Sequence, residues 1–392
     1  MFVHFKQEKT YFKDMEIFRH IQYANAVRFG EPNIMGYSEG ITNHSAPTVC
    51  HQSALRLGFL MGETESMDMS EECHFLNIWT PSRDGNFPVL VWIHGGAYVA
   101  GSGEESSYDG ASLCTQGNIV VVTISYRLGI FGYLHNKKNG VKDLGLKDQI
   151  AALKWVKSHI RRFGGDPENI TLAGQSAGGH SVAAIISSCT DALFKKAIIQ
   201  SAPLSMRTSS AEAENIYDKA CKYSQKPIEQ INAEELLQVQ KKIMKGSKSM
   251  MPFSPLEPDF SGNVTVPSLE KVLITWQKDD AAPFVAMKLN HQDKFGGIID
   301  KIATRIASKK VFENPAKKYA LALQKHGISA DTRCLEWTPE GSAFGACHCL
   351  ELSLMFGTWE RWQGANMLGN ITKEEWEKRS SEFRSIWISF IK

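Results

Sequence analysis

The chain has 392 residues, of which 43% are hydrophobic and 22% are charged, the composition of an ordinary globular protein. Its 44 Lys and Arg residues nearly balance its 42 Asp and Glu residues, and the net charge of +2 provides no basic field for nucleic acid or an anionic membrane. No apolar run reaches the ~20 residues of a membrane-spanning helix. The N-terminal sequence also turns polar and acidic before a secretory signal could form. These features predict a cytoplasmic protein that binds neither nucleic acid nor membranes.

The first half of the chain alternates strand-like and helix-like segments, as βαβ units do. Near-continuous apolar runs suit strands of a parallel sheet covered on both faces, and they occur at 87–93, 118–125, 170–173 and 196–200. A helix is expected from Asp148 to Arg162, where apolar side chains share one side and Gly164-Gly165 follows. The pattern predicts an α/β protein with a mostly parallel central sheet.

The second half carries weaker signals. The polar, helix-prone segment 211–245 is expected to lie outside the sheet as a cap, and 283–289 and 332–337 are weak strand candidates. The amphipathic segment 373–391 is expected to be a C-terminal helix docked on the sheet. Because no repeat or linker interrupts the sequence, we expect one domain over residues 1–392 with a cap-like helical insertion around 205–255.

A G-x-S-x-G sequence, Gly174-Gln175-Ser176-Ala177-Gly178, stands between an expected strand and a helix-compatible run. This is the setting of a nucleophile elbow, in which glycines on both sides of the serine allow a sharp turn that exposes its hydroxyl. Ala177 would open the helix, so its backbone N–H is free to bind an oxyanion. Upstream, His94-Gly95-Gly96-Ala97 follows another expected strand and can offer further N–H donors, although such a turn can also be purely structural.

Six sequence motifs, in order, resemble those of the type-B carboxylesterase and cholinesterase family of α/β-hydrolases. Two examples are SEECHFLNIWTP at 70–81, against the family's SEDCLxLNIWTP, and GACHCLEL at 345–352, against GAxHxxEL. The complete set lies at 18–32, 70–81, 94–98, 139–156, 163–178 and 345–352. The resemblance implies a short, bacterial-looking member with the α/β-hydrolase fold, helices on both faces of the sheet and a reduced helical cap.

The resemblance also implies roles for individual residues. Ser176 matches the family's nucleophile and His348 its catalytic base. Gly96, Ala97 and Ala177 match the three backbone donors of the oxyanion hole, and many members have glycine where this chain has Ala97.

The acid of the triad is the least defined member, because the family usually has Glu in a segment that differs here. Aligning the stretch after 283–287 places Asp293 at that position, and Asp300 and Asp280 are the alternatives. The spacing from Asp293 to His348 is 348 − 293 = 55 residues, shorter than is usual in the family. This shortening implies a reduced cap and an open pocket.

The eight cysteines do not have the spacing of a disulfide scaffold or a zinc site. Cys347-His348-Cys349 resembles a ligand cluster, but consecutive side chains do not readily converge on one tetrahedral metal. No metal or organic cofactor is expected. Cys50 and Cys73 resemble a disulfide pair of secreted family members, and in a chain with no signal peptide we expect free thiols.

The expected activity is hydrolysis of small-molecule carboxylic esters, with short to medium acyl chains, through an acyl-enzyme. Three alternatives stay open: an inactive ligand-binding or adhesion homologue, an acyltransferase, and a lipase on the same fold. The sequence does not indicate the oligomeric state.

Overall fold

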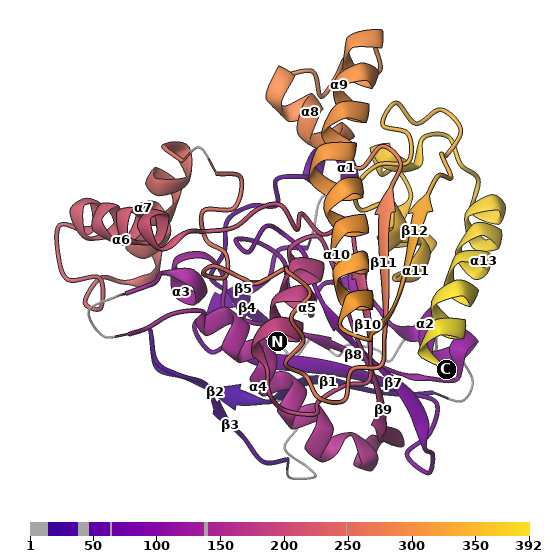
Figure 1. Ribbon diagram of the computed structural model, residues 1–392, viewed down its shortest axis with the longest axis horizontal. Coiled ribbons are helices and arrows are strands. Elements are labelled where there is room, and N and C mark those ends of the chain that lie inside the picture. The colour runs from indigo at the N-terminus through magenta and orange to yellow at the C-terminus, as the bar shows by residue number, and fades with distance from the viewer. Residues whose placement is uncertain (1–14, 38–46, 63–64, 137–139, 248) are drawn as a thin grey trace, which may run out of the picture.

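The computed structural model describes residues 15–37, 47–62, 65–136, 140–247 and 249–392. Within this part of the chain, an eight-stranded sheet forms the centre of the molecule (Figure 1). Its strands run in the order β1 (Glu16–Gln22), β6 (Phe75–Thr80), β8 (Val120–Ile124), β7 (Phe87–Ile93), β9 (Gly165–Gln175), β10 (Lys196–Gln200), β11 (Lys271–Gln277) and β12 (Ser329–Leu335). The pairings from β8 to β12 are parallel, whereas β1 and β6 pair antiparallel with their neighbours.

Short strands and helices surround this sheet. Two small sheets pair β2 (Ala24–Asn25) with β3 (Asn33–Ile34), and β4 (Thr48–Cys50) with β5 (Asp68–Ser70). The α-helices are α1 (Gly58–Met61), α2 (Ala111–Gly117), α3 (Gly129–Tyr133), α4 (Leu144–His159), α5 (Ala177–Ser188), α6 (Ser210–Ser224), α7 (Ala233–Lys245), α8 (Ala282–Leu289), α9 (Ile298–Ser308), α10 (Asn314–Lys325), α11 (Leu350–Met355), α12 (Trp359–Trp362) and α13 (Lys373–Ile391). Short 3-10 helices are η1 (Ser106–Tyr108), η2 (Ile160–Phe163) and η4 (Asn366–Leu368), and η3 (Lys309–Glu313) is a π-helix. Among these described helices, none combines the length and apolar character needed to cross a bilayer.

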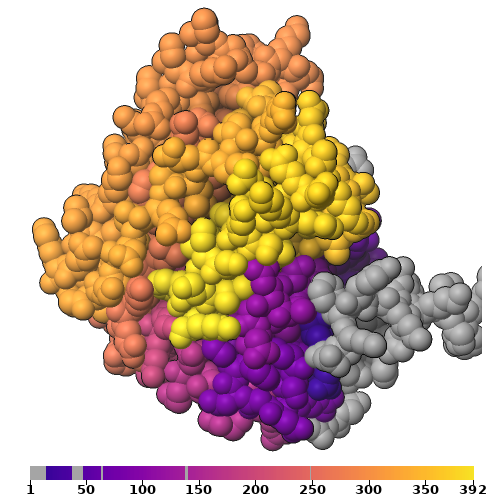
Figure 2. Space-filling view, turned by 90° about the vertical axis from the view of Figure 1, so that its right-hand side faces the viewer, coloured from indigo at the N-terminus to yellow at the C-terminus, as the bar shows by residue number. Residues whose placement is uncertain are grey.

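The sheet is buried on both faces because successive side chains of a strand point to opposite sides. In β7, Val89 and Val91 join one apolar cluster with residues of α4 and α5. Leu90 and Trp92 join a second cluster with residues of α2, α11 and α13. Figure 2 shows the C-terminal segment that includes α13, in yellow, lying against purple segments from the N-terminal half of the chain. The two-sided burial explains why the central strands read as continuous apolar runs.

Most of the expected elements are present. The strands at 87–93 and 196–200 and the helix at 373–391 have the predicted bounds. The segment expected to be helical at 211–245 forms α6, which begins one residue earlier at Ser210, and α7. The expected strand at 283–289 is wrong, because this segment is α8. Pro283 lies in the first turn of that helix, where its missing N–H is not needed, and the strand is β11, before it. The single-domain assignment with a cap around 205–255 stays a prediction.

Cys50 and Cys73 form a disulfide bond, so the expectation of free thiols is wrong. β4 ends at Cys50 and the chain beyond β5 returns to it, which brings the two Cα atoms to 4.9 Å. An oxidised pair is typical of oxidising compartments. The expectation of a cytoplasmic location rested on the N-terminal sequence, which lies outside the described residues, and it stays a prediction.

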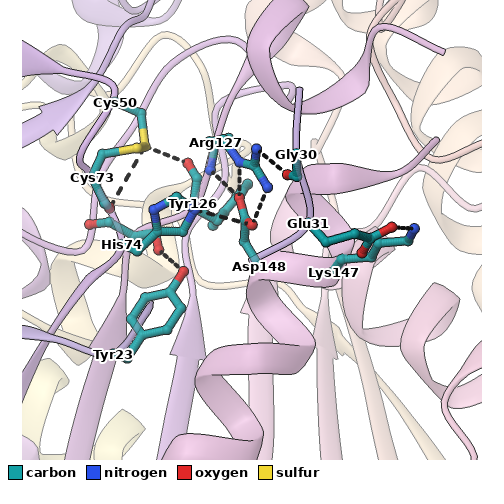
Figure 3. A network of polar contacts seen from close by, with 11 residues as sticks. Tyr23, Gly30, Glu31, Cys50, Cys73, His74, Tyr126, Arg127, Lys147 and Asp148 are labelled. Carbon is teal, nitrogen blue, oxygen red and sulfur yellow. Dashed lines mark hydrogen bonds and ion pairs between the residues drawn. A yellow bond between two sulfur atoms is a disulfide. The ribbon is translucent and has the colours of Figure 1, made fainter. Parts of the chain in front are cut away.

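A buried ion pair joins α4 to the chain that leaves β8 (Figure 3). Arg127 donates from Nε and Nη2 to the two oxygens of Asp148, at 2.8 and 2.7 Å, and from Nη1 to the carbonyl of Gly30 at 2.8 Å. His74 Nε2 lies 3.1 Å from the same carboxylate. Burial alone would raise the pKa of Asp148, but His74 and Arg127 together hold it far below its usual range. The carboxylate is therefore ionised and ties three segments of the chain together.

Replacing this carboxylate should destabilise the fold strongly. In Asp148→Asn, the buried Arg127 guanidinium loses its counter-ion, and we expect the free energy of unfolding to fall by about 3–5 kcal/mol. The matched control is Lys147→Gln, one residue away, which breaks an exposed pair with Glu31 and should cost less than about 1 kcal/mol. Urea denaturation of both variants measures the difference, and equal midpoints would contradict this role of Asp148.

Candidate active site

Ser176 occupies a sharp turn between β9 and α5. Its backbone has φ 57° and ψ −121°, a strained conformation for a residue with a side chain. A Cβ at Gly174 would lie 2.5 Å from the carbonyl carbon of Gly178, and one at Gly178 would lie 2.1 Å from the carbonyl oxygen of Ile93. Only glycine fits at these two positions, as expected for a nucleophile elbow.

The turn after β7 lies directly against this elbow. A Cβ at Gly95 would lie 3.2 Å from the Cβ of Ser176. Gly96 and Ala97 both have positive φ, 107° and 55°, and the carbonyl of Gly96 accepts the N–H groups of the residues three and four positions on. Within the described residues, the N–H groups of Gly96, Ala97 and Ala177 have no acceptor. The three predicted oxyanion donors are therefore free, and two of them belong to a turn that contacts the serine.

His348 lies in the loop before α11 and is almost completely buried. Its Nδ1 lies 2.6 Å from Oδ1 of Asp280, which is also fully buried. The rings of Phe284, from α8, and Phe312, from η3, pack beside the imidazole with centroid separations of 5.0 and 5.3 Å. The imidazole is thus held by one carboxylate and two aromatic rings.

The carboxylate partner of His348 is Asp280, not Asp293. Asp293 is exposed in the turn after α8. Asp300 accepts hydrogen bonds from the backbone N–H groups of Gly296 and Gly297 and so caps the start of α9. The error follows from the misassigned strand. The parallel strand is β11, which ends at Gln277. Functional side chains gather at the carboxyl ends of parallel strands, and Asp279 and Asp280 lie two and three residues beyond this end. With Asp280, the spacing to His348 is 348 − 280 = 68 residues.

Asp279 fixes the loop that carries His348. Its N–H donates to the carbonyl of Ala346 at 2.8 Å, and its Oδ2 accepts the N–H of Ala346 at 3.1 Å. Asp280 is fixed in turn, because its Oδ2 accepts the N–H of Gln277 at 2.9 Å. Asp279 thus holds the backbone of the histidine loop, and Asp280 holds the imidazole ring.

Gln175, which sequence reasoning did not single out, lies against the other side of the imidazole. Its Nε2 is 3.2 Å from His348 Nε2 and 3.4 Å from Cys349 Sγ. An amide NH₂ can only donate, so the contact requires an unprotonated Nε2, with the ring proton on Nδ1 facing Asp280. Within the described part of the chain, Ser176 Oγ has no hydrogen-bond partner. The only signal for Gln175 in the sequence is its place beside the serine.

A second buried carboxylate, Glu351, lies three residues after His348, in the first turn of α11. It accepts from Gln277 Nε2 at 2.7 Å and from the hydroxyl of Ser201 at 3.4 Å. Burial and then the nearby charge of Asp280 raise its pKa to about 7, against a smaller opposing effect of His348. Glu351 therefore keeps its proton through much of the range in which a free carboxyl loses it.

Two other histidines near the motifs have structural partners. His94 Nδ1 contacts the carbonyl of Gly95 at 2.8 Å, and His180 lies between the Tyr98 hydroxyl, at 2.7 Å, and the carbonyl of Met206, at 3.0 Å. Burial lowers the pKa of each to about 4, so both imidazoles are neutral near pH 7. Within the described residues, no group of three His, Cys, Asp or Glu side chains could hold a metal ion.

Comparison with known proteins matches this architecture to ester hydrolases. The sequence model described as the carboxylesterase family matches residues 5–333. A probable N-octanoylanthranilate hydrolase of Rhodococcus erythropolis is 33% identical, over 96% of this chain and 89% of its own length. The para-nitrobenzyl esterase of Bacillus subtilis is 30% identical, over 88% of this chain and 78% of its own length. A solved structure of a PNB esterase superposes with a TM-score of 0.81 at 27% identity, covering 96% of this chain and 87% of that one.

The raised pKa of Glu351 predicts a pH-dependent stability. Between pH 4.5 and about 7 the folded carboxyl keeps a proton that the unfolded chain loses, so the free energy of unfolding falls as pH rises through this window. Glu351→Gln stays neutral and should remove this decline, on the order of 1–3 kcal/mol. Denaturation at pH 4.5 and pH 8 measures it, with the exposed Glu360→Gln as control. Parallel pH curves for wild type and Glu351→Gln would contradict the prediction.

Proposed function

Because this chain belongs to the carboxylesterase family and is a carboxylic ester hydrolase, we propose that Ser176, His348 and Asp280 form its catalytic triad. The observation that carries the proposal is the buried 2.6 Å contact from Asp280 to His348 Nδ1, in a site that also contains the strained turn of Ser176. This contact selects the tautomer with a free lone pair on Nε2, which is the form that a general base needs.

In the proposed first step, His348 Nε2 takes the hydroxyl proton of Ser176 as Oγ attacks the ester carbonyl. Gln175 now faces that nitrogen, so its amide must give way to the serine hydroxyl when substrate binds. Catalytic hydrogen bonds commonly tighten only in the substrate complex. The imidazolium then protonates the departing alcohol, leaving the acyl group on Ser176, and Asp280 stabilises the positive ring meanwhile.

The negative charge that develops on the carbonyl oxygen needs donors that are free before the reaction. The N–H groups of Gly96, Ala97 and Ala177 meet this requirement, since none has an acceptor within the described residues. Each such donor contributes on the order of 3 kcal/mol to lowering the barrier. Water then repeats the cycle on the acyl-enzyme, with His348 again as base, and no cofactor enters any step.

The proposed substrates are small carboxylic esters with short to medium acyl chains. Phe284 and Phe312 give the imidazole an apolar surround, which suits an aliphatic or aromatic substituent beside the reacting carbonyl. The names of the relatives point the same way: one is a para-nitrobenzyl esterase and another a probable hydrolase of an N-octanoyl compound. We propose the eight-carbon acyl chain as the upper part of the range.

The triad assignment is tested by paired substitutions. Ser176→Ala should lower kcat for nitrophenyl butyrate by on the order of 10⁴–10⁶-fold. Asp280→Asn should lower it by about 10⁴-fold, because the asparagine amide favours the wrong tautomer. Asp293→Asn, a matched change at an exposed position, should leave kcat unchanged. Loss of activity in Asp293→Asn with normal turnover in Asp280→Asn would reverse the assignment, and failure of a fluorophosphonate probe to label Ser176 would indicate an inactive homologue.

The acyl preference is tested with nitrophenyl esters of increasing chain length. We expect kcat/KM to be greatest between the butyrate and the octanoate and to fall at least about tenfold for the palmitate, because the longest chain extends beyond the apolar surround. Hydrolysis of N-octanoylanthranilate, measured alongside, compares an amide with the octanoyl ester. A maximum at the palmitate would contradict the proposed range and favour a lipase.

A further inference from the structure

The helix α9 turns its apolar face toward solvent and its polar face toward the protein. Four of the eleven large apolar side chains exposed among the described residues lie on it: Ile298 (78% exposed), Ile299 (74%), Ile302 (57%) and Ile306 (63%). Residues three or four apart lie on the same face of a helix, so these isoleucines form one stripe. Surface helices of globular proteins normally turn such a stripe toward the core.

The buried face of α9 is polar instead. Asp300, Thr304 and Ser308, again spaced by four, are at most 4% exposed. Asp300 caps the helix through two backbone N–H groups, and Ser308 Oγ accepts the N–H of Ala281 at 2.9 Å. These contacts fix the rotation of α9, so the isoleucines cannot turn inward without breaking them.

The exposed charges on α9 itself have one sign. The neighbouring carboxylate of Glu313, whose pKa is lowered first by Lys317 and also by Arg305 and Lys309, is half-buried and paired with Lys317. Lys301 and Arg305 lie on α9 and Lys309 follows at the start of η3, all exposed. Asp300, the one acidic residue in the sequence of α9, is buried. Isoleucines flanked by Lys and Arg characterise helices that lie in the interface of an anionic lipid layer. A second copy of the same face would instead bring like charges together.

We propose that the exposed face of α9 binds anionic lipid surfaces, with Ile298, Ile302 and Ile306 entering the headgroup layer and Lys301 and Arg305 contacting lipid phosphates. This proposal departs from the expectation, based on net charge, that the protein does not contact membranes. Net charge averages over the whole molecule, whereas the face of α9 is locally basic.

Because of the position of α9, binding to a lipid surface would also bring the active site close to that surface. The helix projects from the body of the protein (Figures 1 and 2). It continues into η3, whose Phe312 packs on the ring of His348, and Ser308 holds the residue that follows Asp280. Docking would therefore place the catalytic histidine near esters dissolved in the lipid layer. This use rests on the proposed function, but the binding itself does not.

The experiment measures co-sedimentation of the full chain with vesicles of 30% phosphatidylglycerol in phosphatidylcholine, and with pure phosphatidylcholine. We expect wild type to bind the anionic vesicles at least about tenfold more strongly than the neutral ones. Ile302→Ser with Ile306→Ser, and separately Lys301→Gln with Arg305→Gln, should each reduce binding about tenfold or more. The matched control is Leu321→Ser on α10, at a site 60% exposed, and it should bind as wild type does.

Turnover of a water-soluble nitrophenyl ester shows that each variant is folded, and it should stay unchanged because the substituted side chains face solvent. Binding by Ser176→Ala separates the two proposals, since docking needs no catalysis. Three results would overturn the inference: no binding by wild type, equal binding to neutral and anionic vesicles, or normal binding by the double isoleucine variant. A concentration-dependent dimer that this variant dissociates, without vesicles, would assign the face to a second copy instead.

Discussion

The contact between Asp280 and His348 depends on where β11 ends. At that end, two neighbouring aspartates point in different directions, one to the backbone of the histidine loop and the other to the ring itself. The loop is thereby fixed by the same two residues that supply the carboxylate, so the orientation of the imidazole does not depend on a separate support. The rest of the site is built from chain turns that already stand at neighbouring strand ends, as in other parallel sheets.

Sequence reasoning located the two sharp turns after β7 and β9, because their geometry is encoded locally. The elbow around Ser176 and the turn at Gly96 each need glycine at positions where a Cβ would clash with backbone, and that requirement is visible in the sequence itself. The carboxylate partner of His348 could not be found in this way, because its position depends on which of two apolar segments forms the strand. Both 271–277 and 283–289 are apolar enough, and the choice is made by tertiary pairing of β11 with β10 and β12. The disulfide likewise depends on tertiary contact between Cys50 and Cys73 and on the redox conditions, and the amino-acid composition predicts neither.

Asp148 and Glu351 are both buried, which raises the pKa of each carboxyl, and their different neighbours make the two pKa values differ. Asp148 faces Arg127 and His74, and its pKa lies far below its usual range. Glu351 is equally buried, but its partners are an amide and a hydroxyl, and its pKa rises to about 7. The first is a permanent anion that joins elements of the fold. The second is a carboxyl that loses its proton only near neutral pH, so that below this pH it adds no second negative charge beside Asp280.

The reversed helix α9 follows from the same concentration of polar contacts around the site. Ser308 is buried because its hydroxyl accepts the N–H of Ala281, and Asp300 is buried because it caps the helix. Once these two residues face inward, the spacing of the sequence turns Ile302 and Ile306 outward. The contacts that hold the chain next to Asp280 are therefore the same contacts that turn the apolar stripe of α9 toward solvent. A chain under selection only for stability could replace those isoleucines with polar residues at little cost, since exposed apolar side chains gain nothing from burial. Their grouping on one basic face is thus better explained by contact with something outside the molecule than by the packing of the fold.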